Sequence, residues 1–492
     1  MVNDLIFVKP EEEGLSSQWV EAFLDRMEER KINLHSFMLV RNGKILTEAY
    51  YKPFDKDFKH RLYSSSKTYV AIAIGVLIDE GKLKLEDRIA DYFPEYTGEN
   101  THPWIKNATV EDALKMSAPQ GWTTYADQKY DDWTWTVFNR TENVRPSGAV
   151  WQYNTAATFI LDVLVERITG TSIMEYMRPL FDKIGVSKDI WCVKSPDGYS
   201  WCGSGIVCTL RDFAKFGELI LNKGEYKGEQ LISRAFMERA TSKQIANRFQ
   251  NEYSPLRCCG YGYQIWITDS GYALRGMGSQ LVLCFPDKNF MFVCQADTQC
   301  AGDSTQDYIY DAVKHLLYEK LESKRIGENE QAYKKLCERL DVLSLEEVCG
   351  EDFSEREKSI NGVKFTMDEN PIQWKWFRFD FEKEKGTLTY ENIRGIKQIK
   401  FGRNRFWRGT FPETHYADKQ VGTPANRELD CIASAGWIDE DRLLLRIYVI
   451  DNFLGNCFMT FGFNGKETAI RMVKAAEFFL NEYAGCAGGR RE

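Results

Sequence analysis

Apolar positions in the first 320 residues alternate between helical and strand-like spacing. Residues 16–31 carry their large apolar side chains on one side of a helix. Residues 36–40 and 45–50 alternate as two strands around an Asn-Gly turn, and an apolar helix follows from about residue 64 to residue 80. Further elements are predicted at the end of this region: strands at 262–268, 271–275, 280–285 and 290–296, and a helix at 305–321.

Between the two sets of strands, residues 83–251 show mainly helical patterns and long loops. We therefore predict an α+β fold in which an antiparallel sheet is flanked by the first and last helices. A helical subdomain is inserted into this sheet. The helices predicted for the insert are 110–116, 155–169, 173–181, 210–221 and 233–240.

The composition changes after residue 322. Residues 323–330 are polar and break the apolar pattern, so we expect a linker there and two domains, 1–325 and 326–492. Short strands separated by Gly and Asn predict an all-β accessory domain, a small barrel or a sandwich, closed by a helix at 468–483. The strands predicted for it are 374–381, 386–390, 395–401, 404–409, 443–450 and 456–463.

Composition excludes several classes of function. The chain has 492 residues, 43% of them hydrophobic and 28% charged, which is typical of a soluble globular protein. A net charge of -8 without a basic tract argues against nucleic acid as a partner. No apolar run is long enough to cross a membrane, and the first ten residues do not form a signal peptide. We therefore expect a cytoplasmic protein, and whether a leader was removed stays open.

Cysteine and histidine usage points away from disulfide and metal chemistry. The thirteen cysteines are odd in number and irregularly spaced, so we expect free and mostly buried thiols. The five histidines lack the spacing of metal ligands. We expect neither a metal nor a cofactor.

A hydroxyl and an amine lie three residues apart where the apolar helix begins. Ser64 and Lys67 share a helix face at this spacing. The helix dipole favours an anion on Ser64, and together with burial it disfavours a proton on Lys67. A serine beside a neutral amine is an activated nucleophile. The alternative is a serine-rich helix cap with one exposed lysine.

Several ordered segments place this pair in context. Together they resemble the serine β-lactamase / penicillin-binding-protein superfamily, in particular its class C-like esterase branch, over about residues 15 to 320. The segments that carry the resemblance are Arg61–Thr68, Leu77–Asp87, Tyr92–Glu95, Pro146–Thr155, Gly203–Gly217, Tyr261–Trp266 and Arg275–Asp287.

The resemblance implies three site elements. The first is Ser-x-x-Lys, here Ser64 and Lys67. The second is Tyr-x-Asn, which makes Tyr153 the second base and replaces the usual asparagine with Thr155. A threonine hydroxyl still forms hydrogen bonds but lacks an amide donor, so recognition of a β-lactam amide is weakened.

The third element is normally a Lys-Thr-Gly or His-x-Gly strand. The chain has Met277 where a basic residue is usual, and Arg275, two residues earlier on the same strand face, either substitutes for it or meets an acidic neighbour. By resemblance, the backbone amides of Ser64 and Ser279 form the oxyanion hole, and Gly278 permits close approach to substrate.

Aromatic residues crowd the stretch before Tyr153. They either line the cleft, with Trp133 as a substrate contact, or pack in the core. His60 and His102 lack a Ser-His-Asp arrangement, so we do not assign them as general bases. The other members of this aromatic group are Trp122, Tyr125, Tyr130, Trp135, Phe138 and Trp151.

These features predict a serine hydrolase that forms an acyl-enzyme on Ser64 and acts on an ester of a small molecule. Three alternatives stay open: an acyltransferase to a small alcohol or amine, a D-stereospecific amidase, peptidase or weak β-lactamase, and a non-catalytic binding protein. We expect a small-molecule ester or amide as partner. The oligomeric state stays open, with a homodimer among the alternatives.

Overall fold

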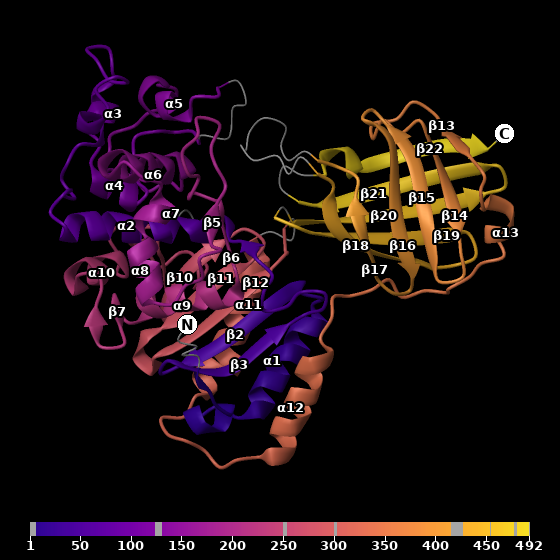
Figure 1. Ribbon diagram of the computed structural model, residues 1–492, viewed down its shortest axis with the longest axis horizontal. Helices are drawn as coiled ribbons and strands as arrows, with labels where there is room; N and C mark the ends of the chain where they lie inside the picture. The colour runs from indigo at the N-terminus through magenta and orange to yellow at the C-terminus, as the bar shows by residue number, and fades with distance from the viewer. Residues whose placement is uncertain are drawn as a thin grey trace. The chain divides into compact units, whose positions relative to one another are not determined.

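The chain forms two compact units that meet at residues 345 and 346. The computed structural model describes residues 6–123, 130–248, 253–299, 303–414, 427–452, 454–476 and 480–491. Figure 1 shows both units, an α+β unit built from the first part of the chain and a β-barrel built from the last part.

The first unit is built on a seven-stranded sheet of order β1-β3-β2-β12-β11-β10-β9. All neighbours are antiparallel except β1 and β3, so the sheet is mixed, with one parallel edge. Asn42 and Gly43, both at positive φ, close the predicted hairpin. The strands are β1 Ile6–Phe7, β2 Leu34–Arg41, β3 Lys44–Tyr50, β9 Trp266–Thr268, β10 Gly271–Gly276, β11 Gln280–Phe285 and β12 Phe290–Ala296.

Helices cover both faces of this sheet, because alternate residues of a strand point to opposite sides. Phe292 of β12 makes an edge contact with Phe23 of α1 (Ser17–Glu29) at 5.5 Å. Its neighbour Met291 lies against Gly217 of α9 (Leu210–Leu221), where a side chain larger than hydrogen would clash. The central strands β2, β11 and β12 are therefore buried between layers. The other helices of this region are α11 Asp303–Leu316 and α12 Glu330–Val342.

The helical subdomain lies between β3 and β9 in the chain, as predicted. It includes the apolar helix α2 (Lys67–Asp79), which packs against α6 (Thr155–Thr169). Its other helices are α3 Pro103–Lys106, α4 Val110–Leu114, α5 Trp133–Asn139, α7 Ile173–Tyr176, α8 Arg178–Lys183 and α10 Arg234–Ala240. Short strands lie in the same region: β4 His60–Arg61, β5 Trp191–Cys192, β6 Ile206–Cys208, β7 Glu225–Tyr226 and β8 Glu229–Gln230.

The second unit is a closed barrel rather than a sandwich. Its sheet runs β16-β15-β14-β13-β22-β21-β20-β19-β18, and β18 pairs back onto β16, while β17 continues the wall beside β18. Closure removes the exposed edges of the sheet. The strands are β13 Phe365–Met367, β14 Trp376–Phe381, β15 Lys385–Asn392, β16 Gly395–Arg403, β17 Trp407–Phe411, β18 Leu429–Trp437, β19 Arg442–Ile450, β20 Leu454–Asn464, β21 Glu467–Ala475 and β22 Gly485–Arg491.

The predicted helix at 468–483 is wrong. Residues Glu467–Ala475 form β21, in which Thr468, Ile470 and Met472 are buried and alternate with exposed residues. Pairing with β20 and β22 on both sides overrides the helical propensity of the Lys-, Glu- and Ala-rich sequence. Strand β18, which is rich in Ala, Ser and Gly, was not predicted, because small residues carry a weak strand signal.

The division between the units lies twenty residues later than the predicted boundary at 325/326. Helix α12 belongs to the first unit because Arg339 forms ion pairs with Asp25 at 2.7 Å and Glu28 at 2.9 Å, both on α1. Residues 323–330, which the sequence predicts as the linker, therefore lie within the first unit. Among the residues that the structure describes, no helix is both long and apolar enough to cross a lipid bilayer.

Candidate active site

Ser64 lies in a tight 3-10 turn, Tyr63–Ser66, that leads directly into α2. The two serines that follow it are buried and pinned. Ser65 Oγ donates to the Gln280 carbonyl at 2.7 Å, and Ser66 Oγ accepts from the Ile206 amide at 3.1 Å. Of the three adjacent serines, Ser64 alone is half-buried, which leaves its hydroxyl accessible for chemistry.

Lys67 is not an exposed lysine beside a helix cap. Its side chain is only 1% exposed, and Nζ donates to Ser64 Oγ at 3.1 Å and to the Gly203 carbonyl at 2.5 Å. The same nitrogen lies 5.1 Å from the centre of the Tyr153 ring. The predicted pair and the predicted second base are thus brought together around one buried amine.

Gly203, whose role the sequence analysis missed, holds the far side of this amine. A Cβ on Gly203 would lie 2.6 Å from Cγ2 of Thr155, so only glycine fits. Buried Arg61 fastens the same segment, donating to the Ser204 carbonyl at 2.8 Å and to its hydroxyl at 3.0 Å. The Gly-Ser-Gly sequence of residues 203–205 was the available signal.

The residue between Tyr153 and Thr155 anchors the second element. Asn154 caps α6 through its Oδ1, which accepts from the Ala156 amide at 2.9 Å. Its Nδ2 donates to the Gln120 and Trp122 carbonyls at 2.9 and 2.7 Å. Thr155 is 3% exposed, and its role as a substrate contact stays a prediction.

An aromatic and cationic stack backs Tyr153. Its ring stacks on Trp266 at 5.4 Å with an interplanar angle of 30°, and the Arg275 guanidinium lies over Trp266 at 4.5 Å. Arg275 Nε also donates to Gln306 Oε1 at 2.9 Å. The guanidinium that the sequence offers as a substitute cation is therefore packed on Trp266, the ring against which Tyr153 stacks.

The third element forms the hairpin turn between β10 and β11. Gly276 pairs with Gln280, and Gly278 and Ser279 between them have φ of 72° and 70°. The Ser279 amide donates to the Gly276 carbonyl at 3.2 Å within the turn. Met277 is half-buried. The assignment of Ser279 to the oxyanion hole stays a prediction.

Trp133 is a core residue rather than part of an open aromatic wall. It is 1% exposed and makes edge contacts with Phe159 at 5.6 Å and Trp201 at 5.5 Å. This burial favours the packing interpretation over the substrate contact predicted from the sequence. Tyr125, another member of the predicted wall, lies outside the described residues.

His60 is engaged away from Ser64. Its Nδ1 lies 3.1 Å from the Arg61 carbonyl, which can only accept, so Nε2 accepts from Nδ1 of His35 at 2.9 Å. Burial lowers the pKa of His60 to about 4 and that of His35 well below its usual range. A neutral, mutually bonded pair is consistent with leaving His60 out of the catalytic set.

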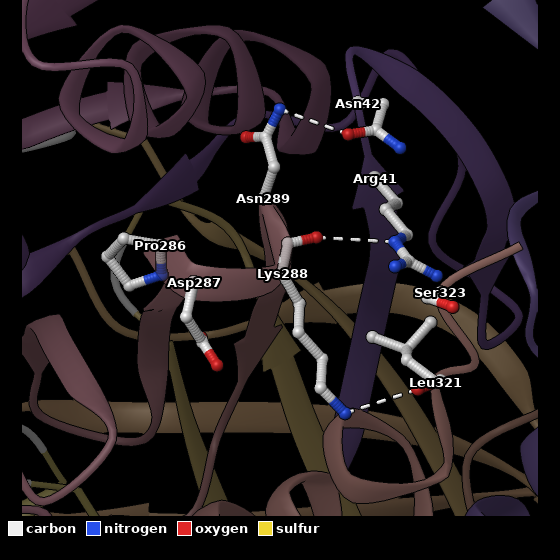
Figure 2. A pocket seen from close by; sticks show the side chains of 8 residues that line it. All are labelled: Arg41, Asn42, Pro286, Asp287, Lys288, Asn289, Leu321 and Ser323. Carbon is white, nitrogen blue, oxygen red and sulfur yellow. Dashed lines mark hydrogen bonds between the residues drawn. The ribbon is translucent and has the colours of Figure 1, made fainter.

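A pocket of about 440 Å³ lies at the other end of the sheet (Figure 2). Arg41 pairs there with Phe290, whereas Gln280 near Ser64 begins the opposite end of β11. Lys288 Nζ donates to the Tyr318 and Leu321 carbonyls, and Arg41 Nε to the carbonyl of Lys288. These cations fasten backbone carbonyls, so we assign the pocket a structural role.

Comparisons with known proteins identify the family of this chain. The sequence profile of the Beta-lactamase family matches residues 19–310, more than half of the chain. The 6-aminohexanoate-dimer hydrolase of Paenarthrobacter ureafaciens is 26% identical over 224 residues, which cover 41% of this chain and 56% of that protein. The match thus spans about half the length of this curated relative.

Solved structures give a weaker likeness. EstCE1, a hydrolase with promiscuous acyltransferase activity, superposes with a TM-score of 0.49 at 15% identity, covering 60% of this chain and 98% of that chain. The octameric penicillin-binding protein homologue from Pyrococcus abyssi gives 0.48 at 14% identity, covering 96% and 99%. Taken with the Ser64–Lys67–Tyr153 cluster, the profile match over residues 19–310 establishes that this chain belongs to the Beta-lactamase family.

Proposed function

We propose that the protein is a serine hydrolase that forms an acyl-enzyme on Ser64 and hydrolyses a carboxylic ester of a small molecule. One observation carries the proposal: a buried lysine amine lies 3.1 Å from the hydroxyl of a half-buried serine and 5.1 Å from the centre of a tyrosine ring. Such contact between nucleophile and base is the arrangement that covalent catalysis requires.

In the proposed reaction Ser64 Oγ attacks the carbonyl carbon of the ester. Lys67 and Tyr153 take the proton of Ser64 and pass it to the leaving alcohol, which departs as the acyl-enzyme forms. Water then attacks the acyl carbon, gives its proton back through the same groups, and releases the carboxylic acid. Atoms and charges balance without a metal or a cofactor.

The surroundings support an uncharged ester more than a β-lactam. Met277 lies where the family has a basic residue, and Arg275 is stacked on Trp266, so a substrate carboxylate lacks its usual partner. Hydrolysis of a small amide is the second candidate, because the curated relative is a hydrolase named for a dimer of an amino acid.

Labelling by a fluorophosphonate probe tests the proposal. We expect wild type to react covalently at one serine and Ser64→Ala to lose at least about 1,000-fold of the labelling rate, since the nucleophile is gone. Peptide mapping should place the label on Ser64. Labelling of another serine, or none, would contradict the proposal and favour a non-catalytic binding protein.

A matched control uses the adjacent serine. Ser65→Ala removes a hydroxyl that is bonded to the Gln280 carbonyl rather than to Lys67, and it should remain labelled. A panel of p-nitrophenyl esters and anilides of the same acids then separates esterase from amidase. Adding small alcohols or amines to the assay shows whether an acceptor competes with water for the acyl group.

A further inference from the structure

Two thiols lie in direct contact beside the candidate active site. Sγ of Cys192 and Sγ of Cys202 are 3.4 Å apart. Cys192 ends β5, and the Trp201 amide donates to the Val193 carbonyl at 2.8 Å, which brings the two cysteine-bearing segments together. Every cysteine in the described part of the chain is a free thiol.

The backbone connects one of the two cysteines directly to the residue that holds the Lys67 amine. Cys202 directly precedes Gly203, whose carbonyl accepts from Lys67 Nζ. The Cys202 amide donates at 2.8 Å to Asp162 Oδ2, so the backbone here is held on both sides. A displacement of Cys202 therefore reaches the group that positions the Lys67 amine.

The two thiols differ in exposure. Cys192 is half-buried and reachable from solvent, whereas Cys202 is fully buried. Cys202 lies beside the buried carboxyl of Asp162, whose Oδ1 has no hydrogen-bond partner among the described residues. An accessible first thiol with a second, enclosed thiol in contact with it is the arrangement of a reactive and a resolving cysteine.

We propose that Cys192 and Cys202 are a reversible oxidation site, at which a hydroperoxide converts the two thiols into a disulfide that displaces the Gly203 carbonyl from Lys67. The effect on activity rests on the proposed function of Lys67. The formation of the disulfide does not.

The chemistry balances with hydrogen peroxide as the oxidant. The Cys192 thiolate attacks one peroxide oxygen, the O–O bond breaks, and water leaves as a sulfenic acid forms. Cys202 sulfur then attacks the Cys192 sulfur, the S–O bond breaks, and the departing hydroxide takes the Cys202 proton to form a second water. In total, two thiols and one peroxide give one disulfide and two waters.

Burial raises the pKa of Cys202 well above its usual range, and burial likewise raises that of Asp162. Closure to a disulfide shortens the sulfur separation from 3.4 Å to about 2.05 Å. Misplacement of about 1 Å near a reacting group can cost about 100-fold in rate.

The test treats the full chain with hydrogen peroxide and follows two readouts. Intact mass and peptide mapping should show loss of two hydrogens and a crosslink between the peptides of Cys192 and Cys202. The rate of fluorophosphonate labelling should fall at least 10-fold and return on reduction with dithiothreitol.

Two variants make the test specific. Cys192→Ser removes the accessible thiol, leaves Lys67 and Gly203 in place, and should abolish both the crosslink and the sensitivity of labelling to peroxide. Cys337→Ser, which removes a half-buried thiol on α12, should behave as wild type.

The inference is overturned if peroxide produces no Cys192–Cys202 crosslink. It is also overturned if the crosslinked protein is labelled as fast as the reduced one. Loss of labelling that persists in Cys192→Ser does the same. A reduced wild type that is never labelled would instead refute the proposed function, and the mapped crosslink would still decide whether the oxidation site exists.

Discussion

Each unit contains a buried cluster of polar side chains, and the two clusters differ in how their hydrogen bonds end. Around Lys67, hydrogen bonds end on the half-buried hydroxyl of Ser64, so the cluster keeps one member open to a substrate. In the barrel, the Tyr483 hydroxyl bonds to Tyr390 at 2.6 Å and to Glu413 at 2.7 Å, and all three side chains are at most 1% exposed. The first cluster thus has a hydroxyl that a ligand could reach, whereas the three side chains of the barrel cluster are closed off from solvent.

The surroundings of the two clusters sharpen this difference. The barrel cluster lies among packed aromatic rings, such as Trp374 stacked on Tyr390 at 4.1 Å. The Lys67 cluster has the stacked rings of Tyr153 and Trp266 on one side but also contacts glycine, at Gly203. Glycine turns let backbone approach a ligand closely, and ring packing does not.

Among the changes that test this difference between the clusters, Tyr153→Phe is expected to have the largest effect. Loss of the phenol removes the proposed second base, so kcat/KM should fall by about 100- to 10,000-fold. The ring stack on Trp266 is retained, and the midpoint of thermal unfolding should stay within a few degrees. Steady-state kinetics on the best ester and a melting curve measure both.

Tyr261→Phe provides the matched control for that variant. Tyr261 lies in the same aromatic group, 5.2 Å from Trp266, but is 1% exposed. Its loss of a hydroxyl should leave kcat/KM within a few-fold of wild type. Equal losses in the two variants would show that the aromatic group acts by packing and that Tyr153 is not a base.

The second effect is a loss of unfolding free energy when the pH is lowered, and it comes from a histidine of the first unit. The pKa of His60 is lowered to about 4 by burial, so the unfolded chain, with a pKa near 6.5, binds the proton first as pH falls. The contribution of neutral His60 to stability is therefore fully present above pH 6.5 and is lost as the pH falls towards 4. We expect His60 to contribute about 2 kcal/mol of loss between pH 7 and pH 5.

Urea unfolding curves of wild type and His60→Asn at the two pH values measure this contribution. The asparagine keeps a donor near the Arg61 carbonyl but does not titrate, so the variant should lose less stability on acidification. An identical dependence on pH in both proteins would show that His60 is solvated and charged in the folded chain.

An effect of similar size on stability, and none on labelling, is expected from Tyr483→Phe in the barrel. The variant leaves Tyr390 and Glu413 each short of one hydrogen bond and should cost about 1 to 3 kcal/mol of unfolding free energy. Labelling of Ser64 should be unchanged. Tyr253→Phe, at a tyrosine that is 60% exposed, controls for loss of a hydroxyl as such. A lower labelling rate in Tyr483→Phe alone would refute a purely structural role for this cluster.

Much of the first unit could be predicted because its signals are local. The Asn42-Gly43 turn, the apolar helix after Ser64 and the spacing of Ser64 and Lys67 are read from neighbouring residues, and the structure agrees with each. The barrel was predicted less well, since the helical interpretation of 468–483 followed residue type and overlooked pairing with β20 and β22, the strands that directly precede and follow it in the chain.

By itself the sequence determined the family, the α+β and all-β division and the helical spacing that brings Lys67 to Ser64, because these depend on residue type at short spacing. Only the tertiary structure decided what Lys67 contacts besides Ser64, where Trp133 lies, and which thiols meet. The contact of Lys67 with Gly203 joins residues 136 apart in the chain, the place of Trp133 depends on burial, and the two thiols, ten residues apart, meet only because the chain folds back between them. No local pattern records how a folded chain excludes water from a given side chain.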